Sequence, residues 1–248
     1  MLFWHLFLLS GETILTNAAM EPEIRDLQNF LNKMGAKVEG AGTNVIRITG
    51  VNKLKDISYN IMPDRIEAGT FLCAAGITGG NLELENVIPE HIGPIINKLE
   101  ECGCKFEINK TKVIIDAPKR LKPTDIKTMP YPGFPTDMQS VFTAMLCISK
   151  GTSVVVENIF ENRYKFTNEL KRMGAKIDIE GKVAVVKGVR KLNGATVEAT
   201  DLRGGAAVVT AGLVAKGRTK VNNIEYILRG YENLDKKLNK VGANIRIE

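Results

Sequence analysis

Apolar and polar residues alternate in four short segments of the chain, and each segment starts at a glycine and ends at an asparagine. Alternation with a period of two predicts a strand that buries one face. The segments recur about every 70 residues, which indicates an internal repeat longer than those of solenoid proteins. They are GETILTN (11–17), GNLELEN (80–86), GTSVVVEN (151–158) and GRTKVNN (217–223).

An amphipathic segment follows each of these strands, ends at a glycine and leads into a further strand. In the first copy Ile24, Leu27, Leu31 and Met34 recur at helical spacing, which predicts a helix with one buried face. Gly35 comes directly after this pattern, and glycine is the typical residue just beyond a helix end. The four helix ends are LNKMGAKVE, LEECGCKFE, LKRMGAKID and LNKVGANIR.

Three further segments are rich in small and apolar residues, which is typical of helices buried on most sides. One unit is therefore predicted as helix, strand, helix, strand, strand. Three copies are complete, and the first keeps at most MLFWHLFLLS (1–10) in place of its buried helix. We predict α/β subdomains around a common axis, with buried helices inside and sheets outside. The buried segments are DRIEAGTFLCAAGIT, TDMQSVFTAMLCIS and TDLRGGAAVVTAGLVA.

Charge and composition narrow the class of protein. The net charge of +6 over 248 residues favours anionic partners such as phosphates, carboxylates or nucleic acid. The cations form no continuous tract and aromatic residues make up only 6%, which disfavours a nucleic-acid-binding module. The four cysteines and two histidines lack metal-ligand spacing, so we expect no metal site and reduced, buried thiols. The N-terminal apolar run is too short to span a membrane.

The segment PYPGFPTDMQ (130–139) places three prolines before a predicted helix. Thr136 and Gln139 fit a capping box, with Thr136 as the N-cap. Asp137 in the first turn suits the positive end of the helix dipole. Capping alone explains this pattern, and a rigid lead-in that aims the carboxylate of Asp137 is the functional alternative.

Arginines occupy unexpected places near the helix starts. Arg65 and Arg203 lie in the first turn of predicted helices, where a cation opposes the helix dipole. Arg163 and Arg229 lie just before or at the start of helices. Helix N-termini and guanidinium groups both bind phosphate and carboxylate, so the sequence predicts an anion site. The alternative is that each arginine pairs with a nearby acidic residue.

Six segments carry a family resemblance: PYPGFPTDMQ, ENIFENRYKFTNELKRMGAKI, ATDLRGGAAVVTAGLVAKG, LRGYENLDKKLNKVGANI, NAAMEPEIRDLQNFLNKMGAK and PDRIEAGTFLCAAGIT. They resemble the UDP-N-acetylglucosamine enolpyruvyl transferases (UDP-N-acetylglucosamine 1-carboxyvinyltransferases), within the EPSP synthase-like family. The resemblance runs from about Gly11 to the C-terminus and implies an inside-out α/β barrel built from repeated units. It assigns residues 1–62 to the last, truncated unit of the domain that carries a mobile loop, and residues 63–248 to the second domain.

The resemblance implies transfer of the enolpyruvyl group from phosphoenolpyruvate to the 3′-hydroxyl of UDP-N-acetylglucosamine, with release of phosphate. This is a cytoplasmic step of peptidoglycan precursor synthesis, and it implies no cofactor, nucleic acid or membrane partner. Asp137 would contact the sugar near the reacting hydroxyl as the candidate general base. Arg163, Arg203 and Arg229 would surround phosphoenolpyruvate. A related transferase acting on shikimate 3-phosphate and a non-catalytic anion-binding fragment are the alternatives.

Four more residues carry implied roles at the same site. Ile159 would give a backbone contact to the UDP-sugar, Arg65 and Glu21 would line or support the cleft, and Asp201 would orient its neighbours. The sequence has no match to the family's N-terminal Lys-Asn pair or to its loop cysteine. We therefore expect the chain alone to be inactive, and a complementing N-terminal fragment is a candidate partner.

Overall fold

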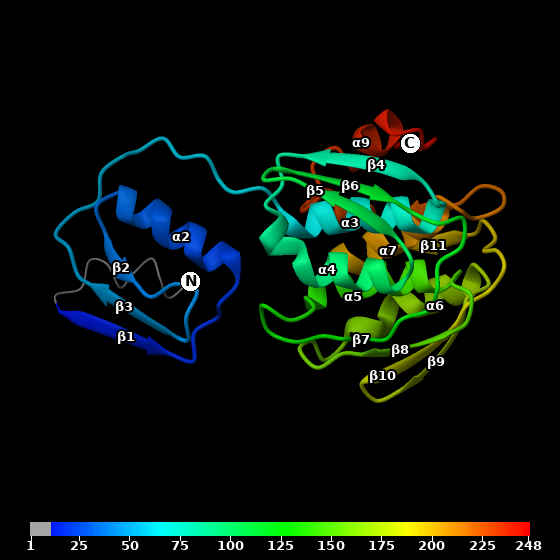
Figure 1. Cartoon of the computed structure of the whole chain (residues 1–248), viewed down its shortest axis with the longest axis horizontal. Coiled ribbons are helices and arrows are strands. Elements are labelled where there is room, and N and C mark those ends of the chain that lie inside the picture. Colours follow the sequence, from blue (N-terminus) through cyan, green and yellow to red (C-terminus); the bar gives the residue numbers. More distant parts are fainter. Residues whose placement is uncertain (1–10) are drawn as a thin grey trace. The chain divides into compact units, whose positions relative to one another are not determined.

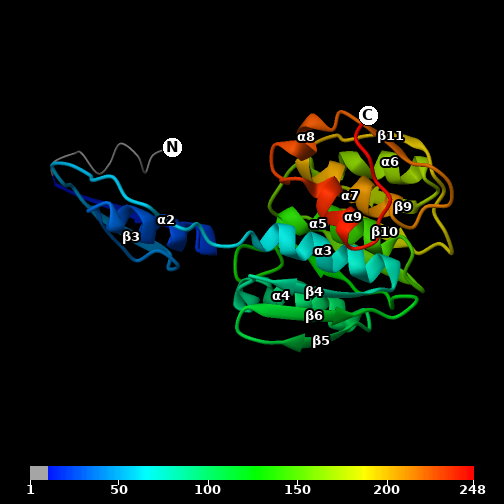
Figure 2. The same cartoon turned by 90° about the horizontal axis from the view of Figure 1, so that it is seen from above.

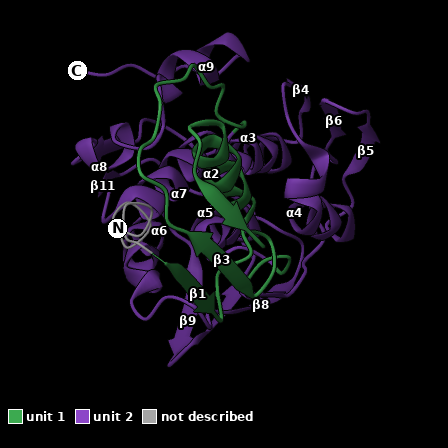
Figure 3. Cartoon of the chain, turned by 90° about the vertical axis from the view of Figure 1, so that its left-hand side faces the viewer, with its two compact units in different colours: residues 1–63, 130–133 green, residues 64–129, 134–248 purple. Residues whose placement is uncertain are grey.

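The computed structural model describes residues 11–248, which divide into two compact units (Figure 3). Unit 1 comprises the chain up to residue 63 together with residues 130–133. Unit 2 comprises residues 64–129 and 134–248. The sequence prediction of a helix remnant at residues 1–10 lies outside the described residues. The assignment of residues 1–62 to the loop-bearing domain of the family stays a prediction.

Unit 1 is one helix packed on a three-stranded antiparallel sheet with the strand order β1-β3-β2. Leu31 of the helix is fully buried against Val38, Ile46 and Ile48 of the strands. Gly35 has φ +101°, a conformation that favours glycine and that ends the helix as the sequence predicted. The elements are β1 (Glu12–Thr16), α2 (Pro22–Lys33), β2 (Lys37–Glu39) and β3 (Val45–Thr49).

Unit 2 contains two copies of the predicted unit and a third copy without its last two strands, around a shared helical core (Figures 1 and 2). The first copy is α3 (Arg65–Thr78), β4 (Asn81–Glu85), α4 (Pro89–Glu101), β5 (Lys105–Ile108) and β6 (Lys112–Asp116). The second is β7 (Ile126–Lys127), α5 (Thr136–Leu146), β8 (Thr152–Val156), the 3-10 helix η1 (Arg163–Phe166), α6 (Thr167–Arg172), β9 (Lys176–Glu180) and β10 (Val183–Lys187). The third is β11 (Thr196–Glu198), α7 (Leu202–Gly212), β12 (Lys220–Asn222), α8 (Glu225–Leu228) and α9 (Leu234–Lys240).

Each copy in unit 2 contributes its own sheet. The strand orders are β4-β6-β5, β7-β8-β10-β9 and β11-β12. Pairing is antiparallel in the first sheet and between β8, β10 and β9, whereas β7 with β8 and β11 with β12 are parallel. The predicted order of helix, strand, helix, strand, strand is confirmed in the first copy, and the second adds the short parallel strand β7. In the third copy the prediction of a strand after Gly242 is wrong, because residues 243–248 pair with no strand.

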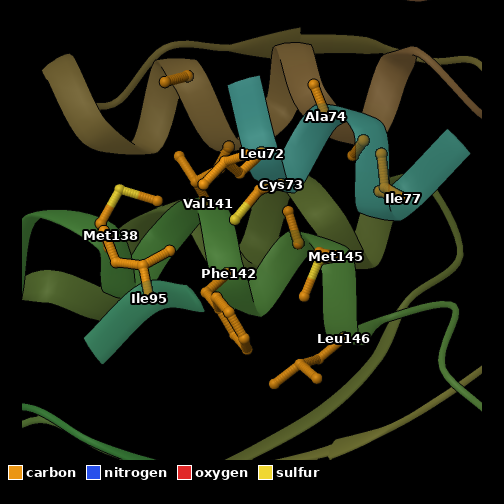
Figure 4. Packing of buried hydrophobic residues seen from close by; sticks show 14 of the residues in the cluster. Leu72, Cys73, Ala74, Ile77, Ile95, Met138, Val141, Phe142, Met145 and Leu146 are labelled. Atoms are coloured by element: carbon orange, nitrogen blue, oxygen red, sulfur yellow. The ribbon is translucent and has the colours of Figure 1, made fainter. Parts of the chain in front are cut away.

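Helices α3, α5 and α7 form the centre of unit 2, with the sheets outside them (Figure 2). Figure 4 shows Leu72 of α3 with Met138, Phe142 and Met145 of α5 among the buried side chains. These four residues are 0% exposed. Small residues allow this close approach: a Cβ at Gly76 would lie 2.9 Å from the sulfur of Met145. The predicted α/β fold class, with buried helices inside, is confirmed.

The four cysteines of the chain are free and buried, as the sequence predicted. Burial raises the pKa of Cys102 and of Cys147 to about 12 and that of Cys104 to about 11, so these thiols stay protonated at neutral pH. Within residues 11–248 no group of His, Cys, Asp and Glu side chains could hold a metal ion. None of the helices in the same residues is long and apolar enough to cross a bilayer.

Candidate active site

Asp137 lies between two guanidinium groups at the start of α5. Its Oδ1 accepts a hydrogen bond from Nη2 of Arg163 at 2.9 Å, and its Oδ2 accepts one from Nη2 of Arg203, also at 2.9 Å. Both contacts are ion pairs. Arg163 lies 26 residues beyond Asp137 in the chain and Arg203 lies 66 residues beyond it, so the fold brings the three together.

The two arginines are far more buried than the carboxylate that they share. The side chains of Arg163 and Arg203 are 7% and 14% exposed, whereas that of Asp137 is 40% exposed. Burial by itself would raise the pKa of Asp137, but the charges and hydrogen bonds of Arg203 and Arg163 outweigh it and lower that pKa below its usual value. Asp137 is therefore ionised at neutral pH, and it is the most solvent-accessible member of its cluster with the two arginines.

The N-terminus of α7 holds Arg203 in place. Asp201 is the N-cap, and its Oδ1 accepts hydrogen bonds from the backbone N–H groups of Arg203 and Gly204, each at 2.9 Å. A Cβ at Gly204 would lie 2.5 Å from Oγ1 of Thr200 and 3.0 Å from Cβ of Phe166, so glycine is needed for this close packing. Helices α5 and α7 pack against each other (Figure 2), and the ion pair of Arg203 with Asp137 joins their first turns.

A buried tyrosine contacts the second amino group of Arg203. Nη1 of Arg203 donates to the hydroxyl of Tyr231 at 3.5 Å, and this hydroxyl lies 2.9 Å from Oγ1 of Thr70 in α3. Thr70 donates its own proton to the backbone carbonyl of Ile66, so the Tyr231 hydroxyl donates to Thr70 and keeps a lone pair for Arg203. Burial raises the pKa of Tyr231, so the phenol stays neutral.

A loop and a threonine surround Arg163. Its guanidinium carbon lies 4.3 Å from the ring centre of Phe160, and its Nη2 also donates to Oγ1 of Thr136 at 3.2 Å. The Thr136 hydroxyl in turn donates to the buried carboxylate of Glu157 at 3.0 Å. The ring and the hydroxyl both limit how this guanidinium can turn.

The predicted capping box at the start of α5 is wrong. The N-cap is Pro135, no side chain caps the helix, and Thr136 is the first helical residue. A capping threonine would accept from a backbone N–H, whereas the oxygen of Thr136 accepts from Nη2 of Arg163 and its hydroxyl proton is donated to Glu157. Gln139 is fully buried, and its amide oxygen accepts from Ser140. The first-turn position of Asp137 is as predicted.

The remaining predicted residues lie on other elements of the two units. Arg65 is buried at the first residue of α3. Arg229 is exposed and lies at the C-cap of α8, not at a helix start, with its guanidinium 6.0 Å from the ring of Tyr226. Ile159 is 46% exposed, and its backbone N–H donates to Glu157. Glu21 is the N-cap of α2 in unit 1, and its role in the site stays a prediction.

Sequence reasoning missed Glu157, Phe160 and Tyr231. A signal for Glu157 was present, because the residue six positions after the strand's glycine is asparagine in the other three copies. No comparable signal exists for Phe160 or Tyr231, whose partners lie on other elements of the fold. The cluster as a whole offers fixed guanidinium groups for phosphate or carboxylate and one carboxylate that can accept a proton.

Comparison with known proteins finds 1-carboxyvinyltransferases both by family model and by sequence identity. Residues 1–238 match the family model described as EPSP synthase (3-phosphoshikimate 1-carboxyvinyltransferase). The chain is 55% identical to UDP-N-acetylglucosamine 1-carboxyvinyltransferase 1 of Caldanaerobacter subterraneus subsp. tengcongensis over 235 residues, which cover 95% of this chain and 57% of that protein. It is 58% identical to UDP-N-acetylglucosamine 1-carboxyvinyltransferase of Desulfofundulus thermocisternus over 221 residues, which cover 89% of this chain and 91% of that protein.

Solved structures share the fold. The enolpyruvyl transferase NikO from Streptomyces tendae matches with a TM-score of 0.85 and 27% identity, over 97% of this chain and 57% of that one. EPSP synthase from Acinetobacter baumannii matches with a TM-score of 0.72 and 21% identity, over 98% of this chain and 59% of that one, which supports the fold alone. The chain thus spans somewhat more than half the length of most relatives that it matches.

Proposed function

Because the chain belongs to the EPSP synthase family of 1-carboxyvinyltransferases, we propose that it serves the transfer of the enolpyruvyl group from phosphoenolpyruvate to the 3′-hydroxyl of UDP-N-acetylglucosamine. The observation that carries the proposal is the carboxylate of Asp137 between Arg163 and Arg203, in a chain 51–58% identical to proteins named for this activity. A hydroxyl nucleophile needs a proton acceptor, and an anionic substrate needs fixed cations.

In the proposed reaction the sugar hydroxyl oxygen bonds to C2 of phosphoenolpyruvate while a proton is added at C3. The tetrahedral adduct then loses phosphate from C2 and a proton from C3, which restores the double bond. Asp137 accepts the hydroxyl proton in the first step. Arg163 and Arg203, with Arg229, bind the phosphate and carboxylate groups, and Arg65 supports this arrangement.

The arginines also control how good a base Asp137 is. In the free protein their two ion pairs hold its pKa low, which favours the ionised form but weakens it as a base. Substrate phosphate and carboxylate oxygens compete for the same guanidinium groups. Their binding therefore raises the pKa of Asp137 and frees an oxygen for the sugar hydroxyl, so the base becomes active when phosphoenolpyruvate is bound.

The remaining parts of the site follow from the same proposal. The N–H of Ile159 is bonded to Glu157, so a backbone contact from Ile159 to the UDP-sugar uses its carbonyl oxygen. Asp201 orients Arg203, and Glu21 keeps the supporting role that the family resemblance implies for it. The reaction belongs to peptidoglycan synthesis and so to cell wall biogenesis, cell shape and cell division, takes place in the cytoplasm and uses no cofactor.

Isothermal titration calorimetry with UDP-N-acetylglucosamine and with shikimate 3-phosphate tests the substrate class. We expect the chain to bind the UDP-sugar, and Asp137→Asn to weaken this binding. Preference for shikimate 3-phosphate would favour the alternative transferase and overturn the proposal. Phosphate release from phosphoenolpyruvate is the matching assay of turnover, and we expect it only when a fragment that supplies the family's N-terminal Lys-Asn pair and loop cysteine is added.

A further inference from the structure

The buried carboxylate of Glu157 is connected to the candidate site through the hydroxyl of Thr136, which contacts Arg163. We propose that Glu157 is a positioning residue: it orients the Thr136 hydroxyl, and through it the Arg163–Asp137 pair, and it builds the loop that presents Ile159 and Phe160. The role of this arrangement in binding a UDP-sugar rests on the proposed function. Its effect on the Arg163–Asp137 pair is independent of the proposed function.

Glu157 is only 2% exposed, and its carboxylate is satisfied by four neutral donors. Oε1 accepts from the hydroxyl of Thr128 at 2.8 Å and from the backbone N–H groups of Ile159 at 2.9 Å and Phe160 at 3.0 Å. Oε2 accepts from the hydroxyl of Thr136 at 3.0 Å. A buried carboxylate without these bonds would be strongly unfavourable, so the four donors are held in fixed directions.

One arm of this network acts on the ion pair. Thr136 has a single hydroxyl proton, which it donates to Glu157, so its lone pairs are left to accept from Nη2 of Arg163 at 3.2 Å. The same Nη2 donates to Asp137 at 2.9 Å. The carboxylate of Glu157 thereby fixes the orientation of a guanidinium that it does not itself contact.

The other arm shapes the loop after β8. With their N–H groups turned toward Glu157, Ile159 and Phe160 keep exposed side chains, at 46% and 53% exposure. The Phe160 ring lies 4.3 Å from the guanidinium carbon of Arg163. Both arms therefore converge on Arg163, one through a hydroxyl and the other through an aromatic ring.

The repeats provide an internal comparison for this position. In three copies the residue after the strand is an asparagine in the left-handed region: Asn17 with φ +55°, Asn86 with φ +55° and Asn223 with φ +58°. Asparagine tolerates this conformation better than most residues. Glu157 occupies the same place in the copy that carries Asp137 and Arg163, and its φ is not positive. The repeat fold therefore does not require a glutamate here.

Two matched variants separate positioning from a purely structural role. Thr136→Val and Thr128→Val each delete one hydroxyl that donates to Glu157, but only Thr136 also contacts Arg163. Glu157→Gln keeps an acceptor oxygen for the loop N–H groups and replaces the other oxygen with an amide donor. The amide then competes with Arg163 for the Thr136 lone pairs and turns the hydroxyl proton away from Glu157.

The direct readout is the carboxyl ¹³C titration of Asp137 by NMR, which requires no substrate. The charged groups that bond Asp137 are Arg163 and Arg203. We expect the pKa of Asp137 to rise in Thr136→Val and in Glu157→Gln and to stay unchanged in Thr128→Val. Loss of the Glu157 charge alone would lower this pKa, so the direction distinguishes the two effects. No rise in Thr136→Val, or a fall in Glu157→Gln, overturns the proposal.

Calorimetry with UDP-N-acetylglucosamine gives the second readout. We expect Thr136→Val to weaken binding about fivefold, the loss that one neutral hydrogen bond supports, and Thr128→Val to stay within about twofold. Equal weakening by both variants would assign Glu157 a structural role only and overturn its role toward the substrate. If the unsubstituted chain does not bind this sugar, the proposed function fails, and the NMR titration still decides whether Glu157 orients the ion pair.

Discussion

Replacing Asp137 by asparagine removes the one negative charge that Arg163 and Arg203 share. The substitution keeps the size of the side chain and one acceptor oxygen. Both guanidinium groups then remain close together, with side chains only 7% and 14% exposed. We expect the variant to fold and to be less stable than the unsubstituted chain.

The exposed fractions of the paired side chains determine how much stability Asp137→Asn loses. Removing one partner of a fully buried ion pair costs about 3–5 kcal/mol, whereas exposed pairs contribute about 0–1 kcal/mol. The Asp137 side chain is 40% exposed, so solvent screens both pairs, and the asparagine oxygen still accepts from one guanidinium. We expect the free energy of unfolding of unit 2 to fall by about 2 kcal/mol at pH 7, between these two limits.

The effect has a defined pH dependence. Although burial alone would raise the pKa of Asp137, Arg203 and Arg163 lower it below its ordinary value of 3.8. A carboxyl whose pKa is lower in the folded state stabilises the fold above its unfolded pKa, and this stabilisation is lost as pH falls through the folded pKa. The stability difference between the two proteins is therefore constant above about pH 5 and shrinks below about pH 4.

Hydrogen exchange in peptides from α5 and α7, measured against urea concentration, reports on unit 2 alone. Asp178→Asn is the matched control, since its pair with Lys187 at 3.2 Å joins side chains that are 74% and 58% exposed. Asp178→Asn should lower the free energy of unfolding by less than about 0.5 kcal/mol. Phosphate should protect Asp137→Asn more than the unsubstituted chain, because both arginines are then free to bind it. A cost at pH 7 no larger than the control's, or one that does not change between pH 7 and pH 3, would refute the reasoning.

Three further predictions concern a buried ring, a tightly packed glycine and the four buried thiols. Phe142→Ala should lower the free energy of unfolding by about 3–5 kcal/mol in urea denaturation, because the ring is fully buried; a loss below about 1 kcal/mol would mean that the site is not tightly packed. Gly188→Ala should cost at least about 2 kcal/mol by the same measurement, since a Cβ would lie 2.0 Å from the carbonyl oxygen of Ser149, and a neutral result would contradict this packing. All four thiols should resist a thiol-specific disulfide reagent at pH 8 in the native protein and react in denaturant, because burial raises the pKa of each; rapid native reaction would contradict their burial.

Local patterns predicted much of the fold. The recurring glycines, the alternating strands and the apolar segments each reflect a preference within a few residues, and such preferences are visible without the tertiary structure. The helix that ends at Gly35 and the buried helix α5 both appear where these patterns placed them. The motif resemblance singled out Asp137, Arg163 and Arg203, which the structure brings together.

The capping box shows why local patterns fail at the site. Thr136 and Gln139 have the spacing of a capping box, but the oxygen of Thr136 accepts from Arg163, 27 positions away, and its hydroxyl donates to Glu157, 21 positions away. Arg229, which was predicted just before or at the start of a helix, is the C-cap of the four-residue helix α8. Hydrogen bonds between distant segments override such local preferences when they satisfy a buried charge.

The sequence by itself determined the repeat, the alternation of helices and strands and the residues capable of binding an anion. Only the tertiary structure decided which of these residues meet. Asp137 pairs with Arg163 and Arg203 because α5 and α7 pack against each other in the helical core, and Glu157 is buried behind them because β8 ends there. The physical reason is that propensities and periodicity are properties of neighbouring residues, whereas ion pairing and desolvation depend on which distant segments the core brings into contact.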